Sequence, residues 1–172
     1  MKKIGLFIAV ICMFYSCGQT PVNFNDKIVV QIDNADLYSE LYVKFLVDSC
    51  LGTGNFEKAM VYSNSIKNQL EEVMENLDKI ESMKGGGDFR MAAKNYIGAL
   101  MKYNTSIAQV IESGGSEDSL SNAKLKKAYN KLEKDLEYKR ELLMHYQKQF
   151  AKSQNLKMQE TPKFHNFPIK GN

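Results

Sequence analysis

Apolar residues in the middle of the chain recur every three or four positions, the spacing that places side chains on one face of an α-helix. The clearest case lies between residues 88 and 113, where two sets of positions repeat every seven residues. These positions are Phe89, Tyr96, Tyr103 and Val110 and, between them, Ala93, Leu100 and Ile107. A heptad repeat predicts a helix that packs lengthwise against neighbouring helices at a shallow crossing angle.

Three other stretches carry apolar positions at helical spacing. The stretch before this one presents Phe56, Met60, Ser63, Leu70, Val73, Leu77 and Ile80. The stretch after it presents Leu125, Tyr129, Leu132, Leu136, Leu143, Tyr146 and Phe150, interrupted by Lys139. The first stretch is apolar on more than one side, at Leu37, Leu41, Tyr42, Phe45, Leu46 and Val47. We therefore expect it to form the most deeply placed helix, or one that also contacts the C-terminal tail.

Glycine clusters separate the four stretches, and glycine is favoured just past a helix end because the left-handed conformation costs it nothing. The clusters are Gly52-Thr53-Gly54, Gly85-Gly86-Gly87 and Gly114-Gly115. Each precedes a residue that can cap a first helical turn, namely Asn55, Asp88, and Ser116 or Ser119, and Asn25 or Asp26 would cap the first stretch. These signals predict helices at about 26–51, 55–84, 88–113 and 117–157.

The connections between these helices are short, so that neighbours must run antiparallel. Prolines occur only at Pro21, Pro162 and Pro168, outside the central region. The predicted fold class is therefore all-α, an antiparallel up-down-up-down four-helix bundle over residues 25–160 with a long last helix. Residues 161–172 form a non-helical tail whose Phe164, Phe167 and Ile169 suit an extended segment. This tail either packs on the bundle or binds a partner.

At the N-terminus, Lys2 and Lys3 precede an apolar run from Ile4 to Phe14 that ends at Ser16-Cys17-Gly18. The run is about half as long as the roughly 20 apolar residues of a transmembrane helix. Charged, apolar and small residues in this order indicate an export signal over residues 1–16. The cysteine resembles that of a lipoprotein signal, which implies acylation of Cys17, by palmitate or a similar chain, and a tether over residues 17–24. Cleavage after Gly18 by an ordinary signal peptidase, giving a secreted soluble periplasmic protein, is the alternative.

Composition narrows the possible partners. The formal net charge of +3 falls to about +1 when Lys2 and Lys3 leave with the signal, so there is no electrostatic reason to expect nucleic acid. Besides Cys12 and Cys17, the chain holds only Cys50, which has no second cysteine for an intramolecular disulfide. Cys50 suits a small buried residue near a helix end, and its role stays open.

Residues that would mark a catalytic or metal centre are sparse. The two histidines do not form the Glu-x-x-His pairs of di-iron bundles, and Glu141 with His145 supplies at most part of a metal site. The sequence holds no Cys-x-x-Cys-His, no phosphate-binding glycine loop and no Ser, His and Asp grouping. We therefore expect neither a cofactor nor a metal, and no enzyme activity.

Three features remain for binding. Carboxylates at Glu71, Glu72, Glu75 and Asp78, within pairing range of Lys67 and Lys79, predict a solvated helix face. Lysines between Lys124 and Lys134 form a mild basic stripe that suits solvent, an anionic membrane or a sugar. Tyrosines on the helix seams form either core or the lining of a ligand pocket, at Tyr96, Tyr103, Tyr129 and Tyr146.

The segments Phe24-Asn25-Asp26-Lys27-Ile28-Val29 and Tyr146-Gln147-Lys148-Gln149-Phe150-Ala151 bracket the predicted bundle. They resemble a family of small helical envelope lipoproteins of Bacteroidetes and spirochaetes, whose function is unknown. The resemblance implies a four-helix envelope protein without transferable catalytic residues. Bacteroidetes lipoproteins that are exported to the cell surface carry acidic residues just after the cysteine. Their absence from residues 18–25 favours the periplasmic face of the outer membrane.

Together these patterns predict a non-enzymatic, lipid-anchored envelope protein. Its membrane contact is the lipid on Cys17, and its bundle binds a protein or glycan partner. The alternative is a periplasmic carrier or sensor that holds a small ligand between its helices.

Overall fold

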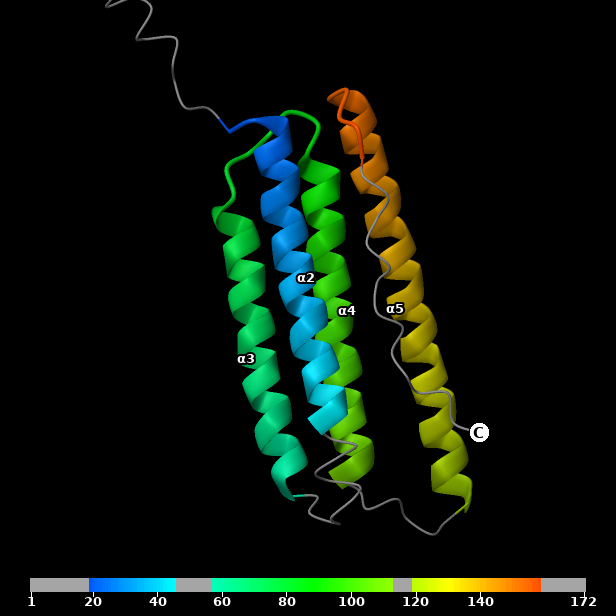
Figure 1. Cartoon of the computed structure of the whole chain (residues 1–172). Helices are drawn as coiled ribbons and strands as arrows, with labels where there is room; N and C mark the ends of the chain where they lie inside the picture. Colours follow the sequence, from blue (N-terminus) through cyan, green and yellow to red (C-terminus); the bar gives the residue numbers. More distant parts are fainter. Residues whose placement is uncertain (1–18, 46–56, 113–118, 159–172) are drawn as a thin grey trace, which may run out of the picture.

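The computed structural model describes residues 19–45, 57–112 and 119–158. These residues form four helices and no strand: α2 (Pro21–Phe45), α3 (Glu57–Lys79), α4 (Gly87–Glu112) and α5 (Ser119–Ser153). Successive helices run antiparallel and pack side by side, as Figure 1 shows. The prediction of an all-α four-helix bundle is confirmed. The predicted signal, the C-terminal tail, Cys17 and Cys50 lie outside the described residues.

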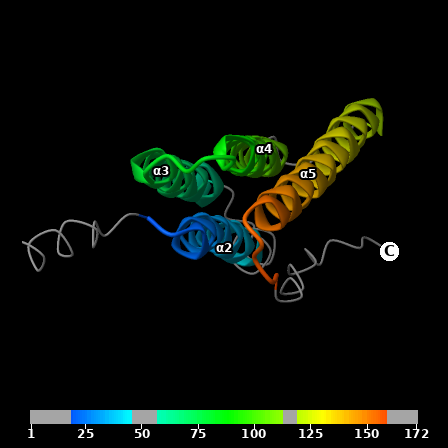
Figure 2. The same ribbon diagram turned by 90° about the horizontal axis from the view of Figure 1, so that it is seen from above.

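Helix α4 is the central helix of the bundle. It packs against α2, α3 and α5, and Figure 2 shows it between α3 and α5 with α2 on one side. The first helix is therefore not the most deeply placed one, and the alternative expectation, contact with the C-terminal tail, involves residues outside the described part. Leu37 and Leu41 on α2 are 50% and 54% exposed, because this helix has close neighbours on one side only.

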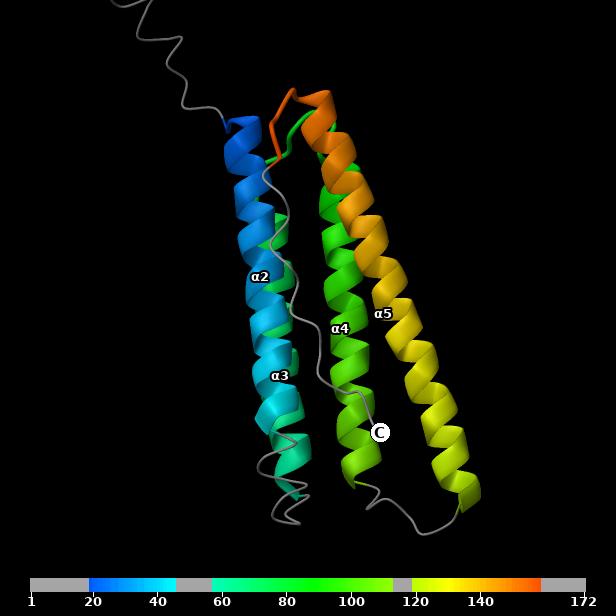
Figure 3. The ribbon, with the colours of Figure 1, turned by 45° about the vertical axis from the view of Figure 1, so that its right-hand side comes forward.

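Helix α5 packs closely on α4 but touches α2 only weakly. Figure 3 shows α5 leaning away from the other helices toward its N-terminal end. The two helices meet where α2 begins and α5 ends: the rings of Phe24 and Phe150 lie 5.1 Å apart, and Gln147 Nε2 donates to Asn25 Oδ1 at 3.1 Å. The bundle is thus tightly closed at this end.

The predicted apolar stripes form the core. The heptad positions of α4 are buried at Phe89, Ala93, Tyr96, Leu100, Tyr103 and Ile107. The stripe of α3 is buried at Ser63, Leu70, Val73, Leu77 and Ile80, and that of α5 at Leu136, Leu143 and Phe150. Leu132 and Tyr146 are partly buried against this core, and Lys139 is half-buried. The side chains of Phe56, Met60, Val110, Leu125 and Tyr129 lie outside the described part.

Helix α2 begins earlier than predicted. The backbone amide of Asn23 donates to Thr20 Oγ1 at 3.2 Å, which makes Thr20 the N-cap, and Pro21 follows in the first helical position that proline favours. Phe24 is fully buried in the core. Residues 21–24 therefore belong to the bundle, not to the predicted tether over 17–24, and Asn25 or Asp26 does not start the helix.

Helix α3 ends at Lys79, five residues before the predicted end at residue 84. The chain then continues along the core, with Ile80 buried, and turns at Gly85, whose φ of 79° suits glycine. Gly86 lies against Phe24, where a Cβ would overlap the ring. The Gly86 carbonyl accepts the first helical bond of α4, from Arg90 N at 3.1 Å. Asp88 is thus within the first turn and not the N-cap predicted for it.

Helix α5 is the longest helix, as predicted, with 35 residues. It ends at Ser153 instead of residue 157 because Asn155 adopts a left-handed conformation, with φ of 54°. The amide of Leu156 then donates to the Ala151 carbonyl at 2.8 Å and that of Asn155 to the Lys152 carbonyl at 3.3 Å. This pair of bonds is the Schellman motif, which stops the helix and turns the chain back.

Candidate functional site

A groove runs along the outer face of α4, between α3 and α5. It encloses about 880 Å³. Its apolar surface comes from Met74 on α3, Met101 on α4 and Leu132 on α5, and Gly98 of α4 is also part of the lining. The groove lies on the side of α4 away from α2, because α4 binds α2 through Asn104, which accepts from Ser39 Oγ at 2.9 Å. Three helices therefore create one elongated surface.

Gly98 shapes the floor of this groove. A Cβ at this position would meet nothing within 4 Å, so no packing contact with the described residues requires glycine here. Glycine inside a helix costs roughly 0.5–1 kcal/mol relative to alanine. The groove also includes Thr105, whose hydroxyl donates to the Met101 carbonyl at 2.9 Å and is thus directed back to its own helix. At Gly98 the floor therefore has no side chain, which would allow another molecule to approach the helix backbone closely.

Charged side chains of both signs border the groove. Glu71, Glu75 and Asp78 contribute carboxylates from α3, and Lys67 and Lys102 contribute ammonium groups. Lys67 Nζ lies 3.8 Å from Glu71 Oε1, and both side chains are half exposed. The predicted acidic helix face is therefore a rim of the groove. A polar rim around an apolar floor is the usual anatomy of a protein interface.

The partners of Asp78 and Lys79 differ from the pairing predicted for the acidic face. Asp78 pairs with Lys94 of α4, whose Nζ lies 2.8 Å from both carboxylate oxygens. Lys79 donates instead to Asn76 Oδ1 at 3.4 Å. The Lys94–Asp78 pair joins α3 to α4 near the end of the groove.

The predicted tyrosines do not gather around this groove. Tyr96 and Tyr103 are 0% and 2% exposed within the core. Tyr146 is partly buried and meets the His145 ring edge-on, at 5.5 Å between ring centres. The side chain of Tyr129 lies outside the described part. None of Tyr96, Tyr103 and Tyr146 lines the groove.

Tyr96 is the centre of a polar network that the sequence pattern did not reveal. Its hydroxyl donates to Asp36 Oδ1 of α2 at 2.5 Å and accepts from Arg140 Nη2 of α5 at 2.9 Å. The Arg140 guanidinium also lies 5.6 Å from the centre of the Tyr96 ring. Burial, and then the neighbouring Asp36 carboxylate, raise the pKa of Tyr96 far above its ordinary value. One phenol thereby ties three helices together, which gives it a structural role.

His145 lies on the surface of α5. Its Nε2 is 2.9 Å from Gln149 Nε2, one turn further along the helix, and Glu141 is exposed. Within the described ranges, no three His, Cys, Asp or Glu residues group closely enough to hold a metal ion.

The outer face of α2 exposes apolar side chains. Val30, Leu37 and Leu41 are each about half exposed, and Asp33 lies on the same side of the helix. Tyr62 of α3 is exposed as well, with its ring 3.7 Å from that of Phe45. This face is a second apolar surface of the described bundle, beside the groove.

Comparisons with known proteins returned no match to a protein-family model, a curated protein or a solved structure. The resemblance to small envelope lipoproteins thus stays a prediction. None of the helices in the described ranges combines the length and apolar character required to cross a membrane.

Proposed function

We propose that this protein is a non-enzymatic, lipid-anchored protein of the cell envelope that binds a partner protein through the groove between α3 and α5. The observation that carries the proposal is the open groove of about 880 Å³ with Gly98 in its floor. A helical glycine without an internal packing role favours close approach by another chain.

The lining of the groove favours a protein partner over a glycan or a small ligand. Met74 and Met101 are flexible and polarizable side chains of the kind used at adaptable binding surfaces. Among the described residues that line the groove none is aromatic, so this part of the lining offers no ring on which a sugar would stack. Tyr96 and Tyr103 are buried in the core, which supports the interaction protein over the carrier that holds its ligand among tyrosines.

The anchor in this proposal is a lipid on Cys17, on the periplasmic face of the outer membrane. Cys17 precedes the first helical residue, Pro21, by four positions, so the tether between lipid and bundle would be short. A short tether would hold the groove at a defined distance from the membrane surface.

Site-specific photo-crosslinking in the host tests the groove. A photoreactive amino acid replaces Lys102, which lines the groove, or Asn95, which is exposed on the same helix but does not line it. We expect a covalent adduct of discrete mass from position 102 and none of that mass from position 95. The additional change Gly98→Leu, which places a bulky side chain at a position with room for at least a Cβ, should abolish the adduct. No adduct at 102, or the same adducts at both positions, would contradict the proposal.

A further inference from the structure

One end of the bundle carries an excess of positive charge. This basic end comprises the start of α2, the connection from α3 to α4, the start of α4, and the end of α5 with the residues that follow it. Its cationic residues are Lys27, Lys79, Lys84, Arg90, Lys148, Lys152 and Lys157. Its carboxylates, apart from Asp78 in the pair with Lys94, are Asp26, Glu81 and Asp88. Among the described residues, seven cationic residues thus face three carboxylates, an excess of four positive charges.

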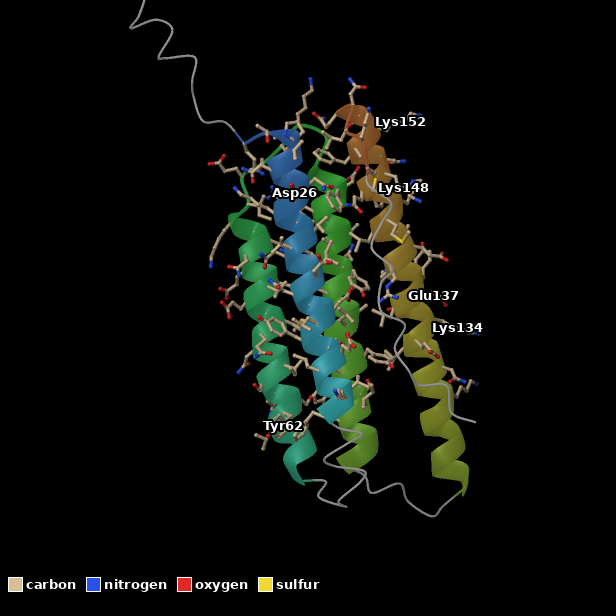
Figure 4. All side chains as sticks on the ribbon, in the orientation of Figure 1. Asp26, Tyr62, Lys134, Glu137, Lys148 and Lys152 are labelled. Atoms are coloured by element: carbon tan, nitrogen blue, oxygen red, sulfur yellow. The ribbon has the colours of Figure 1, made fainter. Side chains whose placement is uncertain are left out.

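These cationic residues come from four separate segments of the chain and converge only in the fold. Figure 4 shows Lys148 and Lys152 of α5 at the same end of the bundle as Asp26 of α2, whereas Lys134 lies toward the other end of α5. The six lysines are exposed, and among the described residues none of them forms an ion pair. Arg90 is half-buried, with its guanidinium against the Phe24 ring at 5.5 Å. The positive charge of the lysines is therefore available to an external partner.

The lipid attachment would leave from this same end. Cys17 is four residues before Pro21, and four extended residues span at most about 14 Å. Charges interact across a distance of about 8 Å at physiological ionic strength. A bundle anchored through Cys17 can therefore bring its basic end within reach of the lipid headgroups when the tether is not fully extended.

We propose that the basic end rests on anionic lipid headgroups, so that the bundle stands upright with the C-terminal end of α2 and the N-terminal end of α5 directed away from the membrane. This inference builds on the lipid anchor of the proposed function. A lipid chain combined with a basic surface gives the two signals that firm membrane attachment requires.

The competing arrangement lays the outer face of α2 flat on the membrane. It would bury Leu37 and Leu41. It would also bring one exposed lysine, Lys44, and two carboxylates, Asp33 and Glu40, toward anionic headgroups, which is a net negative charge. Like charges repel at that contact, whereas the upright arrangement places lysines there. The charge pattern therefore favours the upright arrangement.

The lysines near the start of α5 provide a matched control. Lys131 precedes Lys152 by 21 residues on one continuous helix, a separation of about 32 Å. This distance is several times the screening length, so an upright bundle would hold Lys127, Lys131 and Lys134 beyond the field of the membrane. The basic stripe predicted from the sequence then plays no part in this contact.

The experiment measures vesicle binding by the complete mature chain with Cys17→Ser, which lacks any lipid. Vesicles contain either phosphatidylcholine alone or about one third phosphatidylglycerol. We expect binding only to the anionic vesicles, with loss at high salt. The triple variant Lys84→Glu, Lys148→Glu, Lys152→Glu should bind on the order of 100-fold more weakly, since each of the three lysines contributes about 5-fold. The triple variant Lys127→Glu, Lys131→Glu, Lys134→Glu has the same net charge and should bind like the parent.

Equal loss in the two triple variants would overturn the proposal, because net charge and not the basic end would then determine binding. Absence of binding to anionic vesicles would overturn it too. A variant Leu37→Glu, Leu41→Glu that binds as weakly as the basic-end variant would indicate the flat arrangement instead. Circular dichroism melting curves of all variants confirm that each one is folded. Since no lipid is attached in this assay, its outcome is independent of whether the host acylates Cys17.

Discussion

The Tyr96 hydroxyl donates a hydrogen bond of 2.5 Å to the Asp36 carboxylate, from the centre of α4 to the middle of α2. Arg140 of α5 donates to the same hydroxyl at 2.9 Å. The phenol thus mediates between a carboxylate and a guanidinium that come from helices with little other contact. This relationship, more than apolar packing, links α2 to α5 away from their closed end.

Removing this hydroxyl should destabilise the bundle. In Tyr96→Phe, the buried phenol oxygen is lost while Asp36 and Arg140 keep their charges, and hydrogen bonds to charged groups contribute about 1.5–3 kcal/mol. We expect the free energy of unfolding in urea to fall by about that amount. Tyr138→Phe is the control, because Tyr138 is 54% exposed and its change should be within about 0.5 kcal/mol. Equal unfolding midpoints for the two variants would refute the role of the network.

The Tyr96 hydroxyl should also make the stability of the bundle depend on pH. The pKa of Tyr96 is raised above the ordinary value of 10.0, chiefly by burial, so the folded state holds this proton more tightly than the unfolded chain does. The stability from the protonated phenol is therefore complete below about pH 10 and is lost as the pH rises above it. Wild-type stability should fall with pH more steeply than that of Tyr96→Phe, by up to about 1.4 kcal/mol per pH unit. Urea titrations between about pH 9 and 11 measure both slopes, and parallel slopes would contradict the assignment.

The sequence predicts those parts of the fold that depend on local pattern. The heptad positions from Phe89 to Ile107 identify the buried face of α4, because a seven-residue repeat keeps one face of a helix toward its neighbours. The Tyr96 network could not be predicted, because nothing local says that Asp36 and Arg140 face the same phenol. The depth of the first helix was misjudged for the same reason: apolar Leu37 is a core residue only if a helix covers it.

The candidate site, the groove along α4, could not be predicted from the sequence either. Gly98 belongs to no predicted turn and does not interrupt the apolar positions of α4. Its place in the groove becomes apparent only in the folded structure, where α3 and α5 flank α4. The start of α2 was missed although Thr20-Pro21 is a recognisable cap, since Asn25 and Asp26 offered a competing one. Burial of Phe24 decides between the two starts, and burial is a tertiary property.

Filling the floor of the groove should increase stability. Gly98→Ala adds a Cβ that meets no atom within 4 Å and removes the cost of a helical glycine. We expect the free energy of unfolding to rise by roughly 0.5–1 kcal/mol. Partner crosslinking from Lys102 should weaken at the same time, because the partner loses its close approach to the backbone. A stabilised variant with undiminished crosslinking would mean that Gly98 is not needed for partner binding.

At Gly86, in contrast to Gly98, substitution by alanine should lower the stability of the bundle. There the new Cβ would overlap the Phe24 ring, so that Gly86→Ala must displace a fully buried side chain at the closed end of the bundle. Overpacking of this kind costs about 1–3 kcal/mol. Gly87→Ala is the matched control, because a Cβ at that neighbouring position meets nothing within 4 Å. Thermal unfolding of both variants checks the prediction, and a Gly86→Ala protein as stable as the Gly87→Ala protein would contradict this packing.

The lipid anchor makes a prediction about covalent structure. If Cys17 is acylated, the mature protein purified from membranes of its host begins at Cys17 and carries a diacyl or triacyl mass increment. Cys17→Ala should remove the mass increment and reduce the firm membrane association to a weak, salt-sensitive contact through the basic end, because the attached chains supply about 0.8 kcal/mol per buried methylene. Intact-mass spectrometry of the two proteins measures this directly. A soluble product that begins at Gln19 would instead mean cleavage after Gly18 and ordinary secretion. In that case the groove would still be the proposed binding surface, but its partner would be sought among soluble periplasmic proteins instead of at the membrane face.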